Sequence, residues 1–198
     1  PVLQITWSRY FFTVVFIFPL IFFFFKKYLV WTDKPKLQLI RGLILLTANI
    51  SFFYSISVIS LPKALTLAFV APLVVTAFSP FFLGESVGYR RWAAVIIGFI
   101  GSLVVIRPGF LEINLASLAA LGTGIMYGFY LIITRKLSTS DNPLLTLLLT
   151  GVVGAIIATT FMPFVWVSPT FNQWSIMAAI GLFACIGHLF IILSLKYA

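Results

Sequence analysis

The chain has 198 residues, of which 62% are hydrophobic and only 9% are charged, and its mean hydropathy is +1.15. A soluble domain has too little polar surface to cover so much apolar surface, so the composition excludes an ordinary soluble enzyme and indicates a membrane protein. The net charge of +9 would suggest a nucleic-acid partner in a soluble protein, but the loops explain it below, so we expect no nucleic-acid partner. The single cysteine, Cys185, excludes an internal disulfide and offers no metal cluster, so we expect no metal and no other cofactor.

Seven apolar runs separated by short polar turns predict an all-α, polytopic membrane protein with seven transmembrane helices. We place the helices at 5–25, 37–59, 61–83, 90–106, 113–134, 143–166 and 174–197. Six of the runs are long enough to cross a hydrocarbon core of about 30 Å at about 1.5 Å per residue. The fourth run is short, so Arg90, Arg91 and Arg107 would have to extend toward the headgroups, or the bilayer would have to be thinner there.

Lysine and arginine gather in alternate loops. One set of loops holds ten of the thirteen cations: Lys26, Lys27, Lys34, Lys36, Arg41, Arg90, Arg91, Arg135, Lys136 and Lys196. The opposite set holds Lys63 and Arg107, and Arg9 lies inside the first predicted helix. Because cytoplasmic loops carry the excess of positive charge, we predict the Pro1 end outside and the Ala198 end in the cytoplasm. Four tryptophans at predicted helix ends suit the headgroup level: Trp31, Trp92, Trp166 and Trp174.

The helix predicted at 61–83 contains two prolines, Pro72 near its middle and Pro80 near its cytoplasmic end. Pro72 removes the hydrogen bond to the Ala68 carbonyl. Such an interruption at membrane depth marks a binding or hinge point in transporters, although a kinked packing helix is an equal alternative here. For Pro80 we favour the packing interpretation.

The same run ends in Gly84-Glu85 and is followed by the basic turn Arg90-Arg91 and a second apolar run that stops at 107–109. Gly84 can adopt the left-handed conformation that ends a helix. Glu85 could then pair with Arg90 or Arg91 across the turn. We favour a structural role for both Gly84 and Glu85 over a role in gating or coupling.

The sequence from Leu61 to Gly109 resembles the EamA-type repeat of the drug/metabolite transporter superfamily, and the resemblance extends over essentially the whole chain. It implies two five-helix repeats in inverted orientation, of which this chain would cover helices two to eight. Residues 1–109 would be the last four helices of the first repeat, and 113–198 the first three helices of the second. Pro1 leads straight into a predicted helix, so we expect the chain to begin inside a longer protein. The family implies a multi-pass transporter or exporter of small metabolites in the cytoplasmic (inner) membrane of a bacterium.

Two predicted helices carry polar stripes. The stripe of the second helix consists of Thr47, Ser51, Tyr54 and Ser55, and that of the fifth consists of Thr123, Tyr127, Tyr130 and Thr134. Each stripe covers one helix face, and a polar face within a bilayer must meet other helices or water. The stripes therefore line an aqueous substrate cavity, or they form interhelical hydrogen bonds of about 0.6 kcal/mol each.

Three polar residues stand alone within predicted helices: Arg9, Asn49 and His188. A charge inside a membrane span is a candidate for function, so Arg9 could contact substrate, or it could extend to the nearby outer surface. His188 could carry a coupling proton, but a bond to a neighbouring helix is favoured. Asn49 lies away from the stripe of its helix, which favours a helix–helix bond.

Small residues recur every four positions on other helix faces, around Gly98, Gly124 and Gly128. This spacing lets two helix backbones approach closely, so we interpret these glycines as packing positions.

Catalysis has little support. The acidic residues, Asp33, Glu85, Glu112 and Asp141, all lie in loops or at helix ends, and no paired carboxylates, metal ligands or phosphate loop occur. The sequence therefore predicts a secondary transporter that works by alternating access, not an enzyme. Two alternatives stay open, a membrane-embedded, transferase-like enzyme and a non-transporting membrane assembly subunit. The expected partners are the lipid bilayer and a small-molecule substrate; a coupling proton and a homodimer are open questions.

Overall fold

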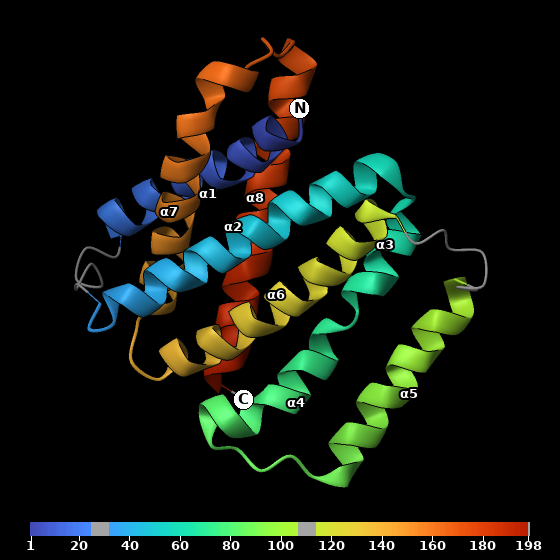
Figure 1. Ribbon diagram of the computed structural model, residues 1–198. Coiled ribbons are helices and arrows are strands. Elements are labelled where there is room, and N and C mark those ends of the chain that lie inside the picture. Colours follow the sequence, from blue (N-terminus) through green and yellow to red (C-terminus); the bar gives the residue numbers. More distant parts are fainter. Residues whose placement is uncertain (25–31, 107–113, 198) are drawn as a thin grey trace. The chain divides into compact units, whose positions relative to one another are not determined.

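The computed structural model describes residues 1–24, 32–106 and 114–197, and every regular element in these ranges is an α-helix (Figure 1). The helices are α1 (Val2–Phe24), α2 (Pro35–Val58), α3 (Leu61–Ala68), α4 (Ala71–Leu83), α5 (Tyr89–Ile106), α6 (Leu115–Ser138), α7 (Pro143–Val165) and α8 (Phe171–Tyr197). The predicted all-α fold is confirmed. Several residues used above lie outside the described ranges: Lys26, Lys27, Trp31, 107–109, Glu112 and Ala198.

Six segments of the described chain are long and apolar enough to cross a membrane. They are α1, α2, the segment Leu61–Leu83 that contains α3 and α4, α6, α7 and α8. The remaining predicted span corresponds to α5, which has only 18 residues. The helix ends agree closely with the predicted ones; the largest difference is at α6, which continues to Ser138 rather than ending at residue 134.

The third predicted span is interrupted near Pro72, because α3 ends at Ala68 and α4 begins at Ala71. Pro72 stands in the first turn of α4, where its missing N–H costs nothing to the new helix. The N–H of Phe69 still donates to the carbonyl of Leu65 at 2.9 Å, so the chain leaves α3 through a regular last turn. The third span therefore consists of two short helices.

Two other helix ends follow from local chemistry. Gly84 ends α4 in the left-handed conformation, with φ at 71°, and its N–H donates to the Pro80 carbonyl at 3.1 Å. At the start of α7, the Asn142 side chain accepts a hydrogen bond from the N–H of Leu144 at 2.9 Å. Glycine and asparagine thus define these two ends, as their backbone and side-chain preferences predict.

The contacts divide the chain into two compact units. Unit 1 comprises Pro1–Leu46 and Ile133–Ala198, and unit 2 comprises Thr47–Ile132. The division falls within α2 and α6, so each unit receives one part of both helices.

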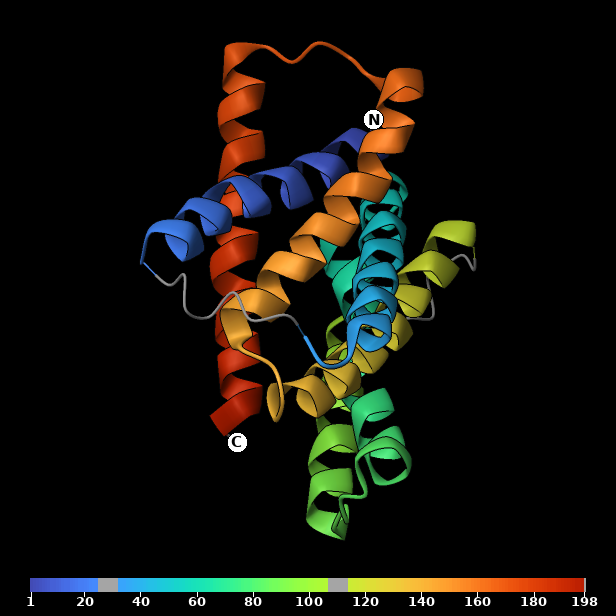
Figure 2. The same ribbon diagram turned by 90° about the vertical axis from the view of Figure 1, so that its left-hand side faces the viewer.

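Unit 1 is built around α1, which packs across α7 and α8 (Figure 2). Its apolar core joins the three helices through two buried clusters, one around Ile17, Leu147 and Cys185 and the other around Trp7 and Met162. Glycine permits the close crossing. A Cβ atom at Gly154 would lie 2.3 Å from the ring of Tyr10, and one at Gly181 would lie 2.3 Å from Cβ of Phe12. Any larger residue at these two glycines would force α1 away.

Unit 2 contains α3, α4 and α5 with parts of α2 and α6. Both α3 and α4 contact α5. The apolar side chains of α5 are largely exposed, as suits a surface that meets lipid: Ile96, Ile97, Ile100 and Val104. Unit 2 therefore buries fewer side chains along α5 than unit 1 buries along α1.

Candidate functional site

The predicted cavity residues fall into two groups. Arg9 and His188 belong to unit 1. The remaining candidates belong to unit 2: Thr47, Ser51, Tyr54, Pro72, Thr123, Tyr127 and Tyr130. Each group is described within its own unit.

Arg9 of α1 and His188 of α8 lie side by side, although 179 positions separate them in the sequence. Arg9 Nη2 lies 2.5 Å from His188 Nε2, so the guanidinium donates and the imidazole nitrogen accepts. The other terminal nitrogen, Arg9 Nη1, is buried and has no hydrogen-bond partner among the described residues. Arg9 is half-buried: its guanidinium bonds to α8, and part of the side chain remains exposed.

A small cavity, which we name the Arg9 cavity, adjoins this pair. It is lined by Arg9, Tyr10, Thr13, Leu45, Leu147, Thr150, Gly151, Ala184 and His188. Its volume is about 10 Å³, room for about one water molecule. In this conformation the space beside Arg9 is closed to any metabolite.

Arg41 is the largest fully buried side chain among the described residues of unit 1, so its predicted place in a cytoplasmic loop is wrong. It lies in the second turn of α2 and donates through Nε to Thr134 Oγ1 at 2.8 Å. Its Nη1 donates to the carbonyl of Thr146 at 3.1 Å and to Thr150 Oγ1. These contacts join α2 to the last part of α6 and to α7 through one guanidinium.

A second buried network begins one turn earlier on α2. Gln38 Nε2 donates to Asp141 Oδ2 at 2.6 Å and to Thr146 Oγ1 at 3.1 Å. Thr32 Oγ1 donates to the same carboxylate oxygen at 2.5 Å. Asp141 is therefore a buried hydrogen-bond acceptor at the turn between α6 and α7. From the sequence alone it was predicted only to lie in a loop or at a helix end.

Thr146 and Thr150 connect these networks to the Arg9 cavity. Thr146 contacts both Gln38 and Arg41, and Thr150 contacts Arg41 and lines the cavity. Hydrogen bonds thus connect Asp141 through Gln38, Thr146 and Arg41 to Thr150, which lines the same cavity as Arg9. Two spacings in the sequence could have indicated it: Gln38 and Arg41 lie three positions apart, and Thr146 and Thr150 lie four apart, so each pair shares a helix face.

The hydroxyls of unit 2 mostly bond to main-chain carbonyls. Ser55 Oγ lies 2.9 Å from the Ala116 carbonyl, and Thr123 Oγ1 lies 3.2 Å from the Ala48 carbonyl. Both pairs join α2 to α6 inside unit 2. The interhelical interpretation of these two stripe positions therefore has direct support.

The remaining stripe residues are more open. Thr47 is exposed, and Ser51 and Tyr54 are half-buried. Tyr127 and Tyr130 stack with ring centroids 5.4 Å apart; Tyr127 is half-buried and Tyr130 is fully buried. The two tyrosines thus form one aromatic surface on α6, of which Tyr127 is the accessible part.

Gly124 and Gly128 place α6 against the break in the third span. A Cβ atom at Gly124 would lie 2.5 Å from the carbonyl oxygen of Ala68, and one at Gly128 would lie 2.7 Å from Val74 Cβ. The carbonyl that Pro72 leaves without its helical partner therefore points at α6, and Pro72 itself is exposed. Gly98 differs from the prediction, because a Cβ atom there would meet nothing within 4 Å in the described part of the chain.

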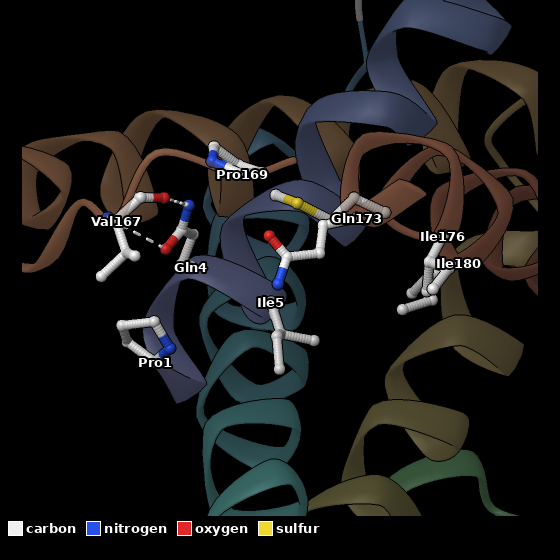
Figure 3. Close-up of a pocket in the computed structure, with 9 residues that line it drawn as sticks. Pro1, Gln4, Ile5, Val167, Pro169, Gln173, Ile176 and Ile180 are labelled. Carbon is white, nitrogen blue, oxygen red and sulfur yellow. Dashed lines mark hydrogen bonds between the residues drawn. The ribbon is translucent and has the colours of Figure 1, made fainter. Parts of the chain in front are cut away.

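A larger pocket of about 260 Å³ lies at the N-terminal end of α1, beside the connection from α7 to α8 (Figure 3). Its lining is mainly apolar and comes from α1, this connection and the start of α8: Pro1, Gln4, Ile5, Val167, Pro169, Gln173, Ile176, Met177 and Ile180. Both polar atoms of the Gln4 side chain are already hydrogen-bonded within the protein. Its Nε2 donates to the Val167 carbonyl at 2.7 Å, and its Oε1 accepts from the Val167 N–H at 3.3 Å. None of the predicted site residues lies in this pocket.

Comparison with known proteins agrees with the fold. One solved crystal structure aligns with 99% of this chain and 70% of its own chain, with a TM-score of 0.74 and 19% identity, which shows a shared fold. The S-adenosylmethionine uptake transporter of Rickettsia bellii is 25% identical over 178 residues, which are 90% of this chain and 61% of the relative. The chain thus spans about three fifths of the length of that relative.

Two other relatives are named for different cargoes. The riboflavin transporter of Vibrio cholerae is 36% identical over 81 residues, which are 41% of this chain and 27% of the relative. The pseudopaline exporter of Pseudomonas aeruginosa is 24% identical over 158 residues, which are 77% of this chain and 55% of the relative. The model of the EamA-like transporter family matches residues 1–107, more than half of the chain. This polytopic membrane protein belongs to the EamA-like transporter family.

Proposed function

We propose that the full-length protein is a secondary transporter that moves a small metabolite across the cytoplasmic membrane of a bacterium by alternating access. The family match over residues 1–107 carries this proposal. The relatives include uptake transporters and an exporter, so they support transport without favouring a direction. The chain supplies part of the transporter, with residues 1–109 and 113–198 as parts of two inverted repeats.

Polar groups inside apolar helices support the same function. A charged side chain at membrane depth costs several kcal/mol, and it persists where it serves an ion or substrate path. Arg9 meets this description in unit 1, and His188 is the side chain to which it bonds. In unit 2 the half-buried Tyr127, Tyr54 and Ser51 are the groups that we assign to substrate contact.

The orientation follows from the charges. With Arg41 inside the bundle, nine Lys and Arg residues remain on the proposed cytoplasmic side, against Lys63 and Arg107 on the other. Single cysteines at Ser86 and Ser140 should react with a membrane-impermeant maleimide only in inverted vesicles. Labelling of either cysteine in intact cells would contradict the orientation and the inverted repeat together.

Flux in proteoliposomes tests the function. The full-length protein should exchange or accumulate a labelled metabolite, and the first cargoes to try are those for which the relatives are named: S-adenosylmethionine, riboflavin and pseudopaline. Protein-free liposomes give the background. A pH gradient imposed in the same assay shows whether a proton is coupled, and cross-linking of the reconstituted protein shows whether a homodimer forms. Chemical turnover of a substrate without flux would instead support the membrane-embedded enzyme, and neither activity would support an assembly subunit.

A further inference from the structure

Unit 1 concentrates positive charge within its helices. Arg9 and Arg41 both lie in helical segments; Arg41 is fully buried, and the half-buried Arg9 bonds to His188 of α8. The acidic residues in the described ranges, Asp33, Glu85 and Asp141, all fall between helices. The buried one of unit 1, Asp141, accepts hydrogen bonds from Thr32 and Gln38. The helices that surround Arg9 therefore offer it hydroxyls, carbonyls and an imidazole, but no carboxylate of their own.

Arg9 is the residue whose charge and hydrogen bonding this arrangement compensates only in part. A guanidinium stays charged in proteins, and burial of a charge is costly unless an opposite charge and hydrogen bonds compensate it. His188 accepts one bond from Nη2, and a neutral imidazole supplies no negative charge. Nη1 is buried and has no hydrogen-bond partner among the described residues, and the ring of Tyr10 lies 5.7 Å from the guanidinium carbon. Arg9 also lines the Arg9 cavity, so an unused donor, a positive charge and a cavity occur at one residue.

A purely structural role would predict a different environment. Arg41 shows what such a role looks like, because its donors reach Thr134, Thr146 and Thr150 and hold three helical segments together. Arg9 makes one side-chain hydrogen bond, from Nη2 to His188, and its Nη1 makes none to the described residues. Two parallel N–H groups are the arrangement with which arginine binds carboxylate or phosphate.

We propose that the Arg9 cavity is the site that binds the anionic group, a carboxylate or a phosphate, of the transported metabolite. The inference rests on the proposed transport function and specifies the substrate class. The guanidinium of Arg9 provides the positive charge and two N–H donor groups. His188 accepts from one of them, Nη2, while no anion is bound. Thr150 lines the cavity, and its hydroxyl accepts from Arg41 and donates to the Thr146 carbonyl, so the positive charge of Arg41 lies close by and adds to the attraction. Because the cavity now holds about one water, the anion enters only when α1 separates from α8.

Binding of simple anions tests this site without a known cargo. We would measure the melting temperature of the purified full-length protein with sodium phosphate, with sodium acetate and with neutral acetamide, at constant ionic strength. We expect a saturable rise in melting temperature with phosphate or acetate and none with acetamide. A rise with phosphate alone assigns a phosphate group, and a rise with acetate alone assigns a carboxylate. No saturable rise with either anion would overturn the proposal.

Variants locate the binding. Arg9→Gln should weaken the apparent anion affinity by about tenfold or more, because the fork and its charge are both lost. Arg90→Gln is the matched control, since Arg90 is exposed in unit 2 and should leave the affinity unchanged. If Arg9→Gln does not fold, Arg9→Lys decides, because it keeps the charge but loses the fork, and the affinity should still fall. Unchanged anion affinity in the folded Arg9 variant would overturn the proposal.

The flux assay separates this inference from the function on which it rests. Flux that survives in Arg9→Gln, with no effect of anions on the wild type, contradicts the anion site and leaves transport standing. Anion binding that depends on Arg9, together with no flux for any cargo tested, supports the site and contradicts the transport assignment.

Discussion

The two units bury polar groups in different ways. Unit 1 buries charged and amide side chains, as in the contacts of Arg41 with Thr134 and of Gln38 with Asp141. The buried polar side chains in the described part of unit 2 are all hydroxyls, of which Ser55 and Thr123 bond to main-chain carbonyls. A hydroxyl on a carbonyl completes its own hydrogen bonding, whereas a guanidinium in apolar surroundings calls for a counter-charge. The difference suggests a chemical role for unit 1 and, for the glycine-lined part of unit 2, a packing role.

The largest effect should come from filling the close contact of unit 2. Gly124→Leu would drive a side chain into the backbone oxygen of Ala68, which lies 2.5 Å from the Cβ position and cannot move as a side chain can. We expect a loss of about 3 kcal/mol or more, or failure to fold. Thermal unfolding of the purified protein measures it. Gly98→Leu is the control with the same sequence spacing, and equal stability of the two variants would show that Gly124 does not depend on this contact.

A smaller loss should follow a change in unit 1. Arg41→Lys keeps the charge but cannot reach Thr134 and Thr150 with one ammonium group as the guanidinium does. The expected cost is about 2 kcal/mol, from buried partners that lose their donors. Chemical unfolding in detergent measures it, with the exposed Arg90→Lys as the control. If both variants unfold at the same denaturant concentration, the network of unit 1 contributes less to stability than its burial implies.

Tyr127 tests whether unit 2 also contacts substrate. Tyr127→Phe removes one hydroxyl and should lower flux by about threefold with unchanged folding, since a hydrogen bond is worth about 0.5–1.5 kcal/mol. Tyr127→Ala also removes the ring that stacks on Tyr130, so it should raise the half-saturation concentration further. Both are measured as initial rates in proteoliposomes. Wild-type rates and half-saturation in both variants would make the tyrosine pair a packing element and would sharpen the contrast between the units.

The smallest effect is expected at Thr123. Thr123→Val is nearly isosteric and removes the bond to the Ala48 carbonyl, which should cost about 0.6 kcal/mol and leave transport unchanged. Thermal unfolding and flux are measured on the same preparation. A clear fall in flux at unchanged stability would return Thr123 to the substrate cavity and weaken the distinction between the units.

The sequence was sufficient to predict the apolar spans and a disturbance of the helix at Pro72, because apolar length and proline chemistry are local properties. It could not identify Arg41 as buried, since a cation near a helix start usually belongs to a loop, and the partners of Arg41 are about 100 positions away. The glycines show the same limit. Gly98 and Gly124 have the same spacing of small residues, but only Gly124 has a neighbouring backbone against it. The spacing shows which face of a helix carries small residues, but only the fold shows which part of the chain packs against that face.

The reciprocal bond between Gln4 and Val167 gives unit 1 a pivot. The side-chain amide contacts both main-chain groups of Val167, so it holds the start of α1 to the connection from α7 to α8. Arg9 is five residues, about 7.5 Å, from this pivot, and the exposed Phe18, which precedes Pro19, is fourteen residues, about 21 Å, from it. If this part of α1 turns as a rigid lever, each 1 Å of opening at Arg9 moves Phe18 by about 3 Å. Spin labels at Phe18 and Leu195 would register that swing as a change in distance, and Gln4→Ala, which removes the pivot contact, should make the swing irregular or abolish it.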